Sequence, residues 1–172
     1  LGRASMEDPE YPNKVMKAKP ETIRPCIACS NCITSMKDEG LPKCSVNPNV
    51  FLEHTYQLGV APEKKSVVVV GGGIAGMAAA EFLTRRGHKV ELYEAKASLG
   101  GNLVAAEEYE FKKDILDLHN WYLQELNRLN VSIHTNSPLT VEDIKALNPD
   151  AVILATGSDY IAPCLPGADS DK

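Results

Sequence analysis

Apolar and polar residues follow different patterns in the first third of the chain and in the remainder. In the first third, prolines, cysteines and charged residues interrupt every apolar run, and only short helices are expected, near Asn13–Lys17 after Pro12, near Asn31–Lys37 and near Asn49–Tyr56. From Ser66 onwards, short β-branched runs alternate with longer segments whose apolar side chains recur every three or four residues. The pattern therefore predicts an irregular first part followed by regular strands and helices.

The regular part is expected to alternate strands with helices. Strands are predicted at Ser66–Val70, Lys89–Tyr93, Val131–His134 and Ala151–Ala155. Helices are predicted at Ile74–Arg86, Phe111–Leu129 and Val141–Leu147, the last with Thr140 as its N-cap. This alternation is typical of a parallel, doubly wound sheet, and the apolar run of the first strand indicates burial on both of its faces. We therefore expect an α/β fold, in which a partial doubly wound parallel sheet follows an irregular segment with four cysteines.

The composition is that of an ordinary globular protein. The 172 residues are 44% hydrophobic and 24% charged, and the net charge of -5 argues against a nucleic-acid partner, whose phosphates require a basic face. The most apolar stretch, residues 66–80, is shorter than a membrane span and contains three consecutive glycines. Because this stretch is too short to span a membrane, no membrane partner is expected. No apolar run opens the chain, so no signal peptide is expected either, and a cytoplasmic location is the default.

A glycine-rich turn is expected between the first strand of the regular part and the helix that follows it. Residues 71–76 read Gly-Gly-Gly-Ile-Ala-Gly and fit the G-x-G-x-x-G pattern of dinucleotide-binding turns. Gly71 would allow the tight turn, Gly73 the close approach of a pyrophosphate, and Gly76 close packing of the helix on the sheet. The pyrophosphate would meet unpaired N–H groups at the helix N-terminus.

An acidic residue lies where such a nucleotide site requires one. Glu94 follows the second strand, eighteen positions after Gly76, and would accept a hydrogen bond from a ribose hydroxyl while repelling a 2′-phosphate. A ligand-free turn with Glu94 as a surface acid is the alternative, and the common register of strand, glycines, helix and acid favours the nucleotide. The segments Leu99–Asn102 and Ala155–Gly157 fit either plain turns or the ligand-binding edge of the sheet.

Four of the five cysteines lie in one short segment. Cys26, Cys29 and Cys32 are separated by two residues each, and Cys44 follows after eleven more. Three thiolates on a tight loop can converge on one side of a cubic cluster, and the fourth can bind the remaining iron when the chain returns. The spacing therefore predicts a [4Fe–4S] site.

Other uses of the cysteines are left open by the spacing. Zinc also binds four cysteines, but its sites more often form from two separated C-x2-C pairs, so the spacing favours the iron–sulfur cluster. Disulfides are disfavoured in a reducing compartment, where clustered cysteines indicate metal binding. Cys164 stands alone and is expected to be a free thiol.

Taken in order, these motifs resemble the junction region of the NADH:flavin oxidoreductase family that includes bacterial 2,4-dienoyl-CoA reductase, 2-enoate reductase and trimethylamine dehydrogenase. The resemblance rests on the segments Leu1-Gly2-Arg3, Asp8-Pro9-Glu10, Arg24-Pro25-Cys26-Ile27-Ala28-Cys29, Cys44-Ser45-Val46-Asn47-Pro48, Ser66–Gly76, Tyr93-Glu94, Gly100-Gly101-Asn102, Ala155-Thr156-Gly157 and Pro166-Gly167-Ala168-Asp169. Dienoyl-CoA reductases often have three residues between the second and third cysteines, whereas this chain has two, as in trimethylamine dehydrogenase. The resemblance thus leaves the substrate class open.

The resemblance implies a three-part enzyme of which this chain is a fragment. Residues 1–25 would end an FMN-binding (β/α)8 barrel, residues 26–62 would hold the [4Fe–4S] cluster, and residues 63–172 would form an incomplete FAD- or ADP-binding Rossmann-like domain. The barrel and an NAD(P) domain of the same polypeptide would be its partners, and a homo-oligomer is left open. Because no residue of the chain is expected to be catalytic, the fragment alone is expected to be inactive.

Carried over by position, the resemblance assigns cofactor contacts to individual residues. The cluster would be bound by Cys26, Cys29, Cys32 and Cys44. FAD would be held by Gly71, Gly72, Gly73, Ala75, Gly76, Glu94, Gly101 and Asn102. Gly2 and Arg3 would bind the FMN phosphate, with a solvated arginine as the alternative for Arg3.

The implied reaction is the reduction of an activated C=C bond in an enoate or a dienoyl-CoA, an EC 1.3.1 activity. Electrons would pass from NAD(P)H to FAD, through the cluster to FMN, and then to the small-molecule substrate. One alternative is an amine dehydrogenase of the trimethylamine dehydrogenase type, with ADP in the Rossmann-like domain. The other is a non-catalytic module that binds zinc and a nucleotide, which a brown, iron-containing protein would exclude.

Overall fold

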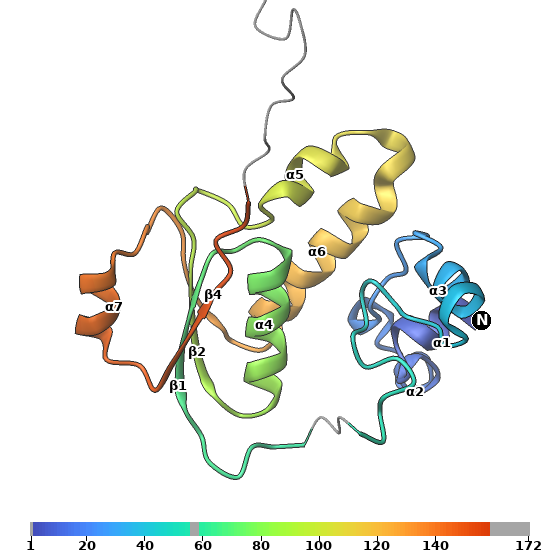
Figure 1. Ribbon diagram of the computed structural model, residues 1–172, viewed down its shortest axis with the longest axis horizontal. Helices are drawn as coiled ribbons and strands as arrows, with labels where there is room; N and C mark the ends of the chain where they lie inside the picture. The colour runs from blue at the N-terminus through green and yellow to red at the C-terminus, as the bar shows by residue number, and fades with distance from the viewer. Residues whose placement is uncertain (1, 56–58, 159–172) are drawn as a thin grey trace, which may run out of the picture.

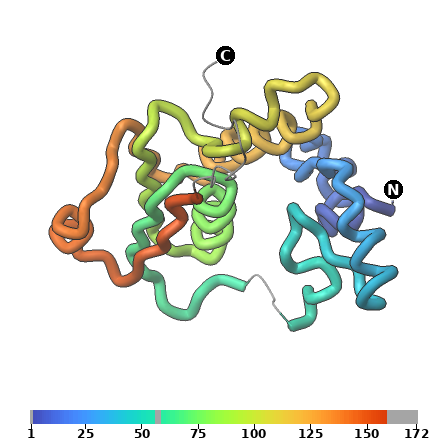
Figure 2. Tube along the Cα trace, turned by 45° about the horizontal axis from the view of Figure 1, so that its top comes forward, coloured from blue at the N-terminus to red at the C-terminus, as the bar shows by residue number. Residues whose placement is uncertain are grey.

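The computed structural model describes residues 2–55 and 59–158 and shows two parts packed side by side (Figures 1 and 2). A small helical part, drawn in blue, contains the four clustered cysteines. The α/β part follows, and its two longest helices, α4 (Ile74–Arg85) and α6 (Lys113–Arg128), lie between the sheet and the small part. Cys164 and the motif at residues 166–169 lie outside the described residues.

The small part consists of short helices joined by turns. They are α1 (Gly2–Glu7), α2 (Tyr11–Met16), the 3-10 turn η1 (Pro20–Thr22) and α3 (Asn31–Glu39). The helix expected after Pro12 begins just before it, because proline is tolerated in the first turn of a helix, where its missing N–H has no intrahelical partner. α3 confirms the second expected helix and ends at Gly40, whose φ of 71° suits a glycine C-cap. The apolar pattern does not predict α1.

The helix expected at Asn49–Tyr56 is wrong, because residues 49–55 form a series of turns. Phe51 has a φ of 59°, a left-handed conformation that an α-helix cannot contain. The Asn47 side chain accepts a hydrogen bond of 3.0 Å from the backbone N–H of Asn49, a local contact that competes with helix formation. Tyr56, the last residue of the expected helix, lies outside the described residues.

Four parallel strands form one sheet, which confirms the predicted α/β fold class. The strands are β1 (Ser66–Val70), β2 (Lys89–Tyr93), β3 (Ser132–His134) and β4 (Ala151–Leu154), in the order β3-β2-β1-β4. β1 pairs with β2 on one side and β4 on the other, and its three middle valines are buried. The turn that follows β1 therefore lies where the strand order reverses, at the carboxyl edge where open α/β sheets bind ligands.

Helices lie on both sides of the sheet. α4 packs on β1 and β2, and α7 (Val141–Leu147) lies on the opposite side (Figure 1). α7 begins with a capping box between Thr140 and Asp143, which confirms Thr140 as its N-cap. A helix that the pattern does not predict, α5 (Asn102–Glu107), is followed by the 3-10 turn η2 (Glu110–Lys112) and packs against α6. No helix in the described part of the chain is long and apolar enough to cross a membrane.

One apolar core connects the two parts. Its largest fully buried side chains are Val69, Met77, Leu92 and Leu126, each of which contributes about 1.5–3 kcal/mol by burial. Val46 of the small part is buried in the same cluster of side chains, and the partly buried Ile27 and Cys44 pack against it. The cysteine segment is therefore packed onto the α/β part and shares its core.

Candidate cofactor sites at a cysteine hollow and a glycine turn

The backbone between the clustered cysteines is tightly folded. Cys26 and Cys29 lie in the loop before α3, and Cys32 lies in its first turn. Between them, Ala28 and Ser30 adopt left-handed conformations with φ of 51° and 60°. Such conformations are uncommon outside glycine and asparagine, and they reverse the chain within a few residues.

A buried serine ties the returning chain to α3. The Ser35 hydroxyl donates a hydrogen bond of 2.7 Å to the carbonyl of Asn31, one helical turn earlier. The same oxygen accepts a hydrogen bond of 2.7 Å from the backbone N–H of Lys43. Because Lys43 directly precedes Cys44, Ser35 fixes the fourth cysteine relative to the helix that carries the third.

All four clustered cysteines line one small hollow of about 20 Å³. Arg3, Met6 and Glu7 of α1 line it as well, together with Ile27, Ser30, Ser45 and Val46. The structure thus brings together the four residues that the spacing predicts as ligands. Among the described residues, no three His, Cys, Asp or Glu side chains are placed to hold one metal ion.

The four cysteines are a donor set that fits an iron–sulfur cluster. A [4Fe–4S] cluster takes four cysteine sulfurs as ligands. Because the cluster contains four irons, its ligands must surround it, and the four cysteines line one hollow. Zinc takes the same donors but requires them to converge on one point at Zn–S distances of about 2.3 Å. The exposed position of Cys29 leaves one side of the hollow open to solvent.

The thiols of Cys26 and Cys29 differ in acidity. Burial raises the pKa of Cys26, and the nearby Glu7 carboxylate also raises it, because a negative charge opposes a thiolate. Burial acts in the same direction on Cys29, but hydrogen bonds with Ser45 and with backbone N–H groups outweigh it, so the pKa of Cys29 is lowered. The Sγ of Cys29 lies 3.3 Å from the Ser45 Oγ. Glu7 belongs to no recognisable motif, and the motif at residues 44–48, which contains Ser45, does not indicate its contact with Cys29.

Two glycines of the turn after β1 are required by close backbone contacts. A Cβ on Gly76 would lie 1.8 Å from the Gly71 carbonyl oxygen, and a Cβ on Gly71 would lie 2.2 Å from that of Ala155. Gly71 also has a φ of 104°, which favours glycine. These contacts place the start of α4 directly against the ends of β1 and β4.

Gly73 is different, because the fold itself has room for a side chain there. Within the described part of the chain, a Cβ at this position would meet only the Gly101 Cα, at 4.0 Å, and the φ of −71° is accessible to any residue. Gly73 is also the N-cap of α4, so unpaired N–H groups of the first turn lie beside this open space. The open space and the N–H groups fit the pyrophosphate of a dinucleotide, which the motif predicts at this position.

Glu94 is held beside the turn. One carboxylate oxygen accepts a hydrogen bond of 2.6 Å from the Gly72 N–H, and the other accepts one of 2.8 Å from the Lys96 N–H. The side chain is buried, so it is not the surface acid of the alternative reading. Since each carboxylate oxygen can accept a second hydrogen bond, Glu94 can still bind a ribose hydroxyl.

The Gly100–Gly101 turn lies against the first glycine turn. The Gly100 N–H donates a hydrogen bond of 2.9 Å to the Gly72 carbonyl, and Gly73 and Gly100 form a parallel β-bridge. Behind it, the buried ring of His119 lies where a Cβ on Gly100 would be, and its Nδ1 is 2.8 Å from a Glu107 carboxylate oxygen. The structure therefore brings Gly101 to the nucleotide turn, and it adds the pair of Glu107 and His119, which no motif identifies.

The remaining predicted residues lie near the two sites. Ala75 and Asn102 are exposed at the starts of α4 and α5, next to the open space at Gly73. Gly2 is exposed at the start of α1, and Arg3 lines the cysteine hollow. The predicted contact of Gly2 and Arg3 with an FMN phosphate stays a prediction.

Residues 69–125 match a family model described as an NAD(P)-binding Rossmann-like domain. The match extends from β1 into α6 and contains both glycine turns and Glu94. It agrees with the parallel sheet and with the nucleotide turn described above.

Two characterised relatives match nearly the whole chain. An NADH oxidase of Thermoanaerobacter brockii is 42% identical over 175 residues, which is 100% of this chain and 27% of the relative. A cinnamate reductase of Clostridium sporogenes is 41% identical over 170 residues, which is 98% of this chain and 26% of the relative. The chain thus spans about a quarter of the length of these relatives.

Two solved structures contain the same arrangement. A 2-naphthoyl-CoA reductase complex has a TM-score of 0.90 and 32% identity, covering 97% of this chain and 26% of that one. Histamine dehydrogenase of Rhizobium sp. 4-9 has a TM-score of 0.85 and 30% identity, covering 92% of this chain and 24% of that one. Both the small part and the α/β part therefore occur together in larger proteins.

Proposed function

Because the chain belongs to the flavin oxidoreductase family of 2-enoate reductase, 2,4-dienoyl-CoA reductase and trimethylamine dehydrogenase, we propose that it is the electron-transferring part of an NAD(P)H-dependent reductase of activated C=C bonds. In this proposal, residues 26–62 hold a [4Fe–4S] cluster and residues 63–172 form the first part of an FAD domain. Residues 1–25 are the end of an FMN barrel in the same polypeptide.

The proposal rests on one observation, which is that the segments carrying the two candidate sites pack against the same apolar core. Four thiols line one hollow, and Cys44 packs against the same buried cluster of side chains as Met77 of α4, the helix that begins at the nucleotide turn. A rigid core between two redox sites keeps their separation constant, which electron transfer requires. A nucleotide-binding module with a separate zinc site would not need this packing.

Each group of residues has a proposed role. Cys26, Cys29, Cys32 and Cys44 bind the cluster. The Ser45 hydroxyl, which accepts a hydrogen bond of 3.3 Å from the Cys29 thiol, would donate to the Cys29 thiolate once that sulfur binds iron, and hydrogen bonds to sulfur shift the potential of such clusters. Gly73 and the first N–H groups of α4 bind the pyrophosphate of FAD, and Glu94 binds its adenosine ribose. Gly2 and Arg3 contact the phosphate of FMN.

The cofactors supply the redox chemistry of the proposal. When bound, FAD, the cluster and FMN would supply the transfer of electrons from NAD(P)H to the C=C bond, which takes up two electrons and two protons in all. The chain contributes positions and environment, and its residues transfer no proton to the substrate. The similarity to a cinnamate reductase and to a 2-naphthoyl-CoA reductase supports an unsaturated acid or thioester as substrate.

An amine dehydrogenase is the second candidate, and a specific observation favours it. The two-residue spacing between Cys29 and Cys32 is the one found in trimethylamine dehydrogenase, and a dimethylamine dehydrogenase of Hyphomicrobium sp. is 30% identical over 175 residues. In that case, ADP would occupy the nucleotide site.

The two candidates predict opposite reactions for the full-length polypeptide that contains this chain. After anaerobic purification, we expect NADH or NADPH oxidation that depends on an α,β-unsaturated acid such as cinnamate, and FAD in the nucleotide extracted from the protein. Oxidation of methylated amines without NAD(P)H, together with extracted ADP, would support the second candidate instead. Neither activity, with one zinc per chain, would exclude both.

A further inference from the structure

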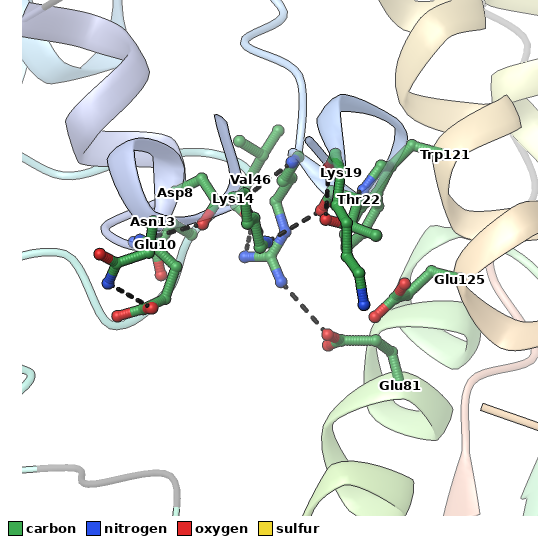
Figure 3. A network of polar contacts seen from close by, with 12 residues as sticks. Asp8, Glu10, Asn13, Lys14, Lys19, Thr22, Val46, Glu81, Trp121 and Glu125 are labelled. Carbon is green, nitrogen blue, oxygen red and sulfur yellow. Dashed lines mark hydrogen bonds and ion pairs between the residues drawn. The ribbon is translucent and has the colours of Figure 1, made fainter. Parts of the chain in front are cut away.

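Arg24 connects the cysteine segment to the α/β part. Figure 3 shows the polar network at this junction, with Asp8 and Val46 on one side and Glu81 and Trp121 on the other. One guanidinium nitrogen, Nη1, donates a hydrogen bond of 3.0 Å to the Val46 carbonyl, and Nη2 lies 3.5 Å from a carboxylate oxygen of Glu81. The guanidinium carbon also lies 4.9 Å from the centre of the Trp121 ring, within cation–π range.

The contacts of Arg24 involve segments that carry both candidate sites. Arg24 precedes Cys26 by two residues, and Val46 follows Cys44 by two. Glu81 lies on α4, the helix that begins at the nucleotide turn. One side chain therefore ties both ends of the cysteine segment to the nucleotide-binding helix.

The contacts of Arg24 are fixed from both sides. Its backbone N–H donates a hydrogen bond of 2.9 Å to Asp8, whose same carboxylate oxygen is 2.6 Å from the Lys14 ammonium. On the other side, the Arg85 Nε lies 2.8 Å from the Glu81 oxygen that faces Arg24. The exposed fractions of the Arg24 and Glu81 side chains are only 15% and 6%, so the pair has few alternative arrangements in water.

The geometry requires a guanidinium in particular. A planar fork can donate to a carbonyl and to a carboxylate in different directions while its face stacks on an indole ring. A lysine ammonium at this position is a point charge, which could satisfy one acceptor but could not stack in the same way. The choice of arginine thus indicates that orientation, and not charge alone, matters at this junction.

We propose that Arg24 is a positioning residue that fixes the cysteine segment at a set distance from the nucleotide turn, by holding Val46 and Glu81 at once. The inference rests on the proposed function, in which the two sites exchange electrons. Arg24 touches neither the cysteine sulfurs nor the turn itself, and it acts through the segments that carry them.

The test measures the separation of the two parts directly. A nitroxide is attached by oxime chemistry to p-acetylphenylalanine at the exposed positions Lys37 of α3 and Gln124 of α6, which leaves the native cysteines unmodified. Double electron–electron resonance on the full chain should give one narrow distance distribution. In Arg24→Met the distribution should broaden or shift, and in Arg24→Lys the change should be partial.

Lys43→Met is the matched control. It removes the same charge from the same segment, but Lys43 is exposed and pairs with Glu39 of α3, so the distance distribution should stay as in the wild type. If Arg24→Met does not fold, as judged by its thermal unfolding transition, Glu81→Gln provides the second variant and should broaden the distribution less. A folded Arg24→Met or Glu81→Gln chain with the wild-type distribution would overturn the inference.

Failure of the proposed function would be recognised separately. Iron and sulfide contents after anaerobic reconstitution report on the cluster, whereas the label distance does not depend on it. If the chain binds no iron but Arg24→Met loses the fixed label distance, the proposed function is refuted and the positioning role of Arg24 is supported. If the chain binds iron but Arg24→Met keeps the wild-type label distance, the positioning role of Arg24 is refuted and the proposed function is not.

Discussion

At the scale of single residues, the glycines of the first turn separate into two kinds. Gly76 is a requirement of the fold, because a Cβ there would lie 1.8 Å from the Gly71 carbonyl oxygen. Gly73 has open space around it and an ordinary φ, so the fold gives no reason for glycine at this position. A ligand that approaches the backbone does give one.

This difference predicts opposite effects for two alanine variants. Gly76→Ala should lower the free energy of unfolding by roughly 1–3 kcal/mol or more, because the backbone must move to admit the methyl group. Gly73→Ala should change that free energy by less than about 1 kcal/mol. Its affinity for ADP, measured by calorimetry, should nevertheless fall by at least about tenfold, which is ~1.4 kcal/mol. Wild-type ADP affinity in Gly73→Ala would argue against a nucleotide at this turn.

Residue types and spacing predicted residues that the structure brings together in two places. The four cysteines line one hollow, and Glu94 lies beside Gly72, as the motifs suggest. Glu7, Ser35 and Arg24 could not be found in this way, because their roles come from contacts between segments distant in the chain. No local pattern encodes such contacts.

At the scale of elements, a buried carboxylate joins α4 to α6. Glu125 of α6 is 2.8 Å from Nη2 of Arg85 on α4 and 2.6 Å from Nη2 of Arg128 on its own helix. Burial alone raises the pKa of Glu125, but the hydrogen bonds from the two arginines outweigh it, and the pKa is lowered overall. The contact between the two helices therefore depends on the ionised carboxylate.

Glu125→Gln should destabilise the chain by about 1–3 kcal/mol at neutral pH, because two arginines lose a charged partner. The pKa of Glu125 is lower in the folded chain than in the unfolded chain, so its contribution is complete above the unfolded pKa and is lost as pH falls through the folded pKa. Urea unfolding from neutral to acidic pH should therefore show a shallower loss of stability in Glu125→Gln than in the wild type. Glu142→Gln, at an exposed position on α7, is the control and should leave the profile unchanged. Equal slopes in wild type and Glu125→Gln would contradict the assignment.

The long elements were predictable because their apolar periodicity is strong, whereas two of the short helices, α1 and α5, were not predicted. β1 and β2 have the predicted bounds, and α4 and α6 differ from prediction only at their ends. α1 and α5 are six-residue helices, which depend on tertiary packing more than on propensity. In residues 49–55, the hydrogen bond from the Asn49 N–H to the Asn47 side chain and the left-handed backbone of Phe51 prevailed over a segment that the sequence predicts as helical.

At the scale of the whole molecule, the two parts share one core and one ionic junction. Val46 and Cys44 join the apolar cluster of the α/β part, and Arg24 joins the small part to α4. The same pair of parts recurs within proteins about four times as long as this chain. In the proposed function, the shared core and the ionic junction keep the two candidate cofactor sites at a fixed separation.

The central claim is that the four clustered thiols bind one iron–sulfur cluster, and Cys44→Ser tests it most directly. Cys164→Ser is the matched control, since it removes the cysteine that stands apart from the four. After anaerobic reconstitution, wild type and Cys164→Ser should each contain about four iron and four sulfide per chain and give the same EPR signal on reduction. Cys44→Ser should lose most of its iron and that signal. Unchanged iron and EPR in Cys44→Ser, or one zinc and no iron in the wild type, would contradict the claim.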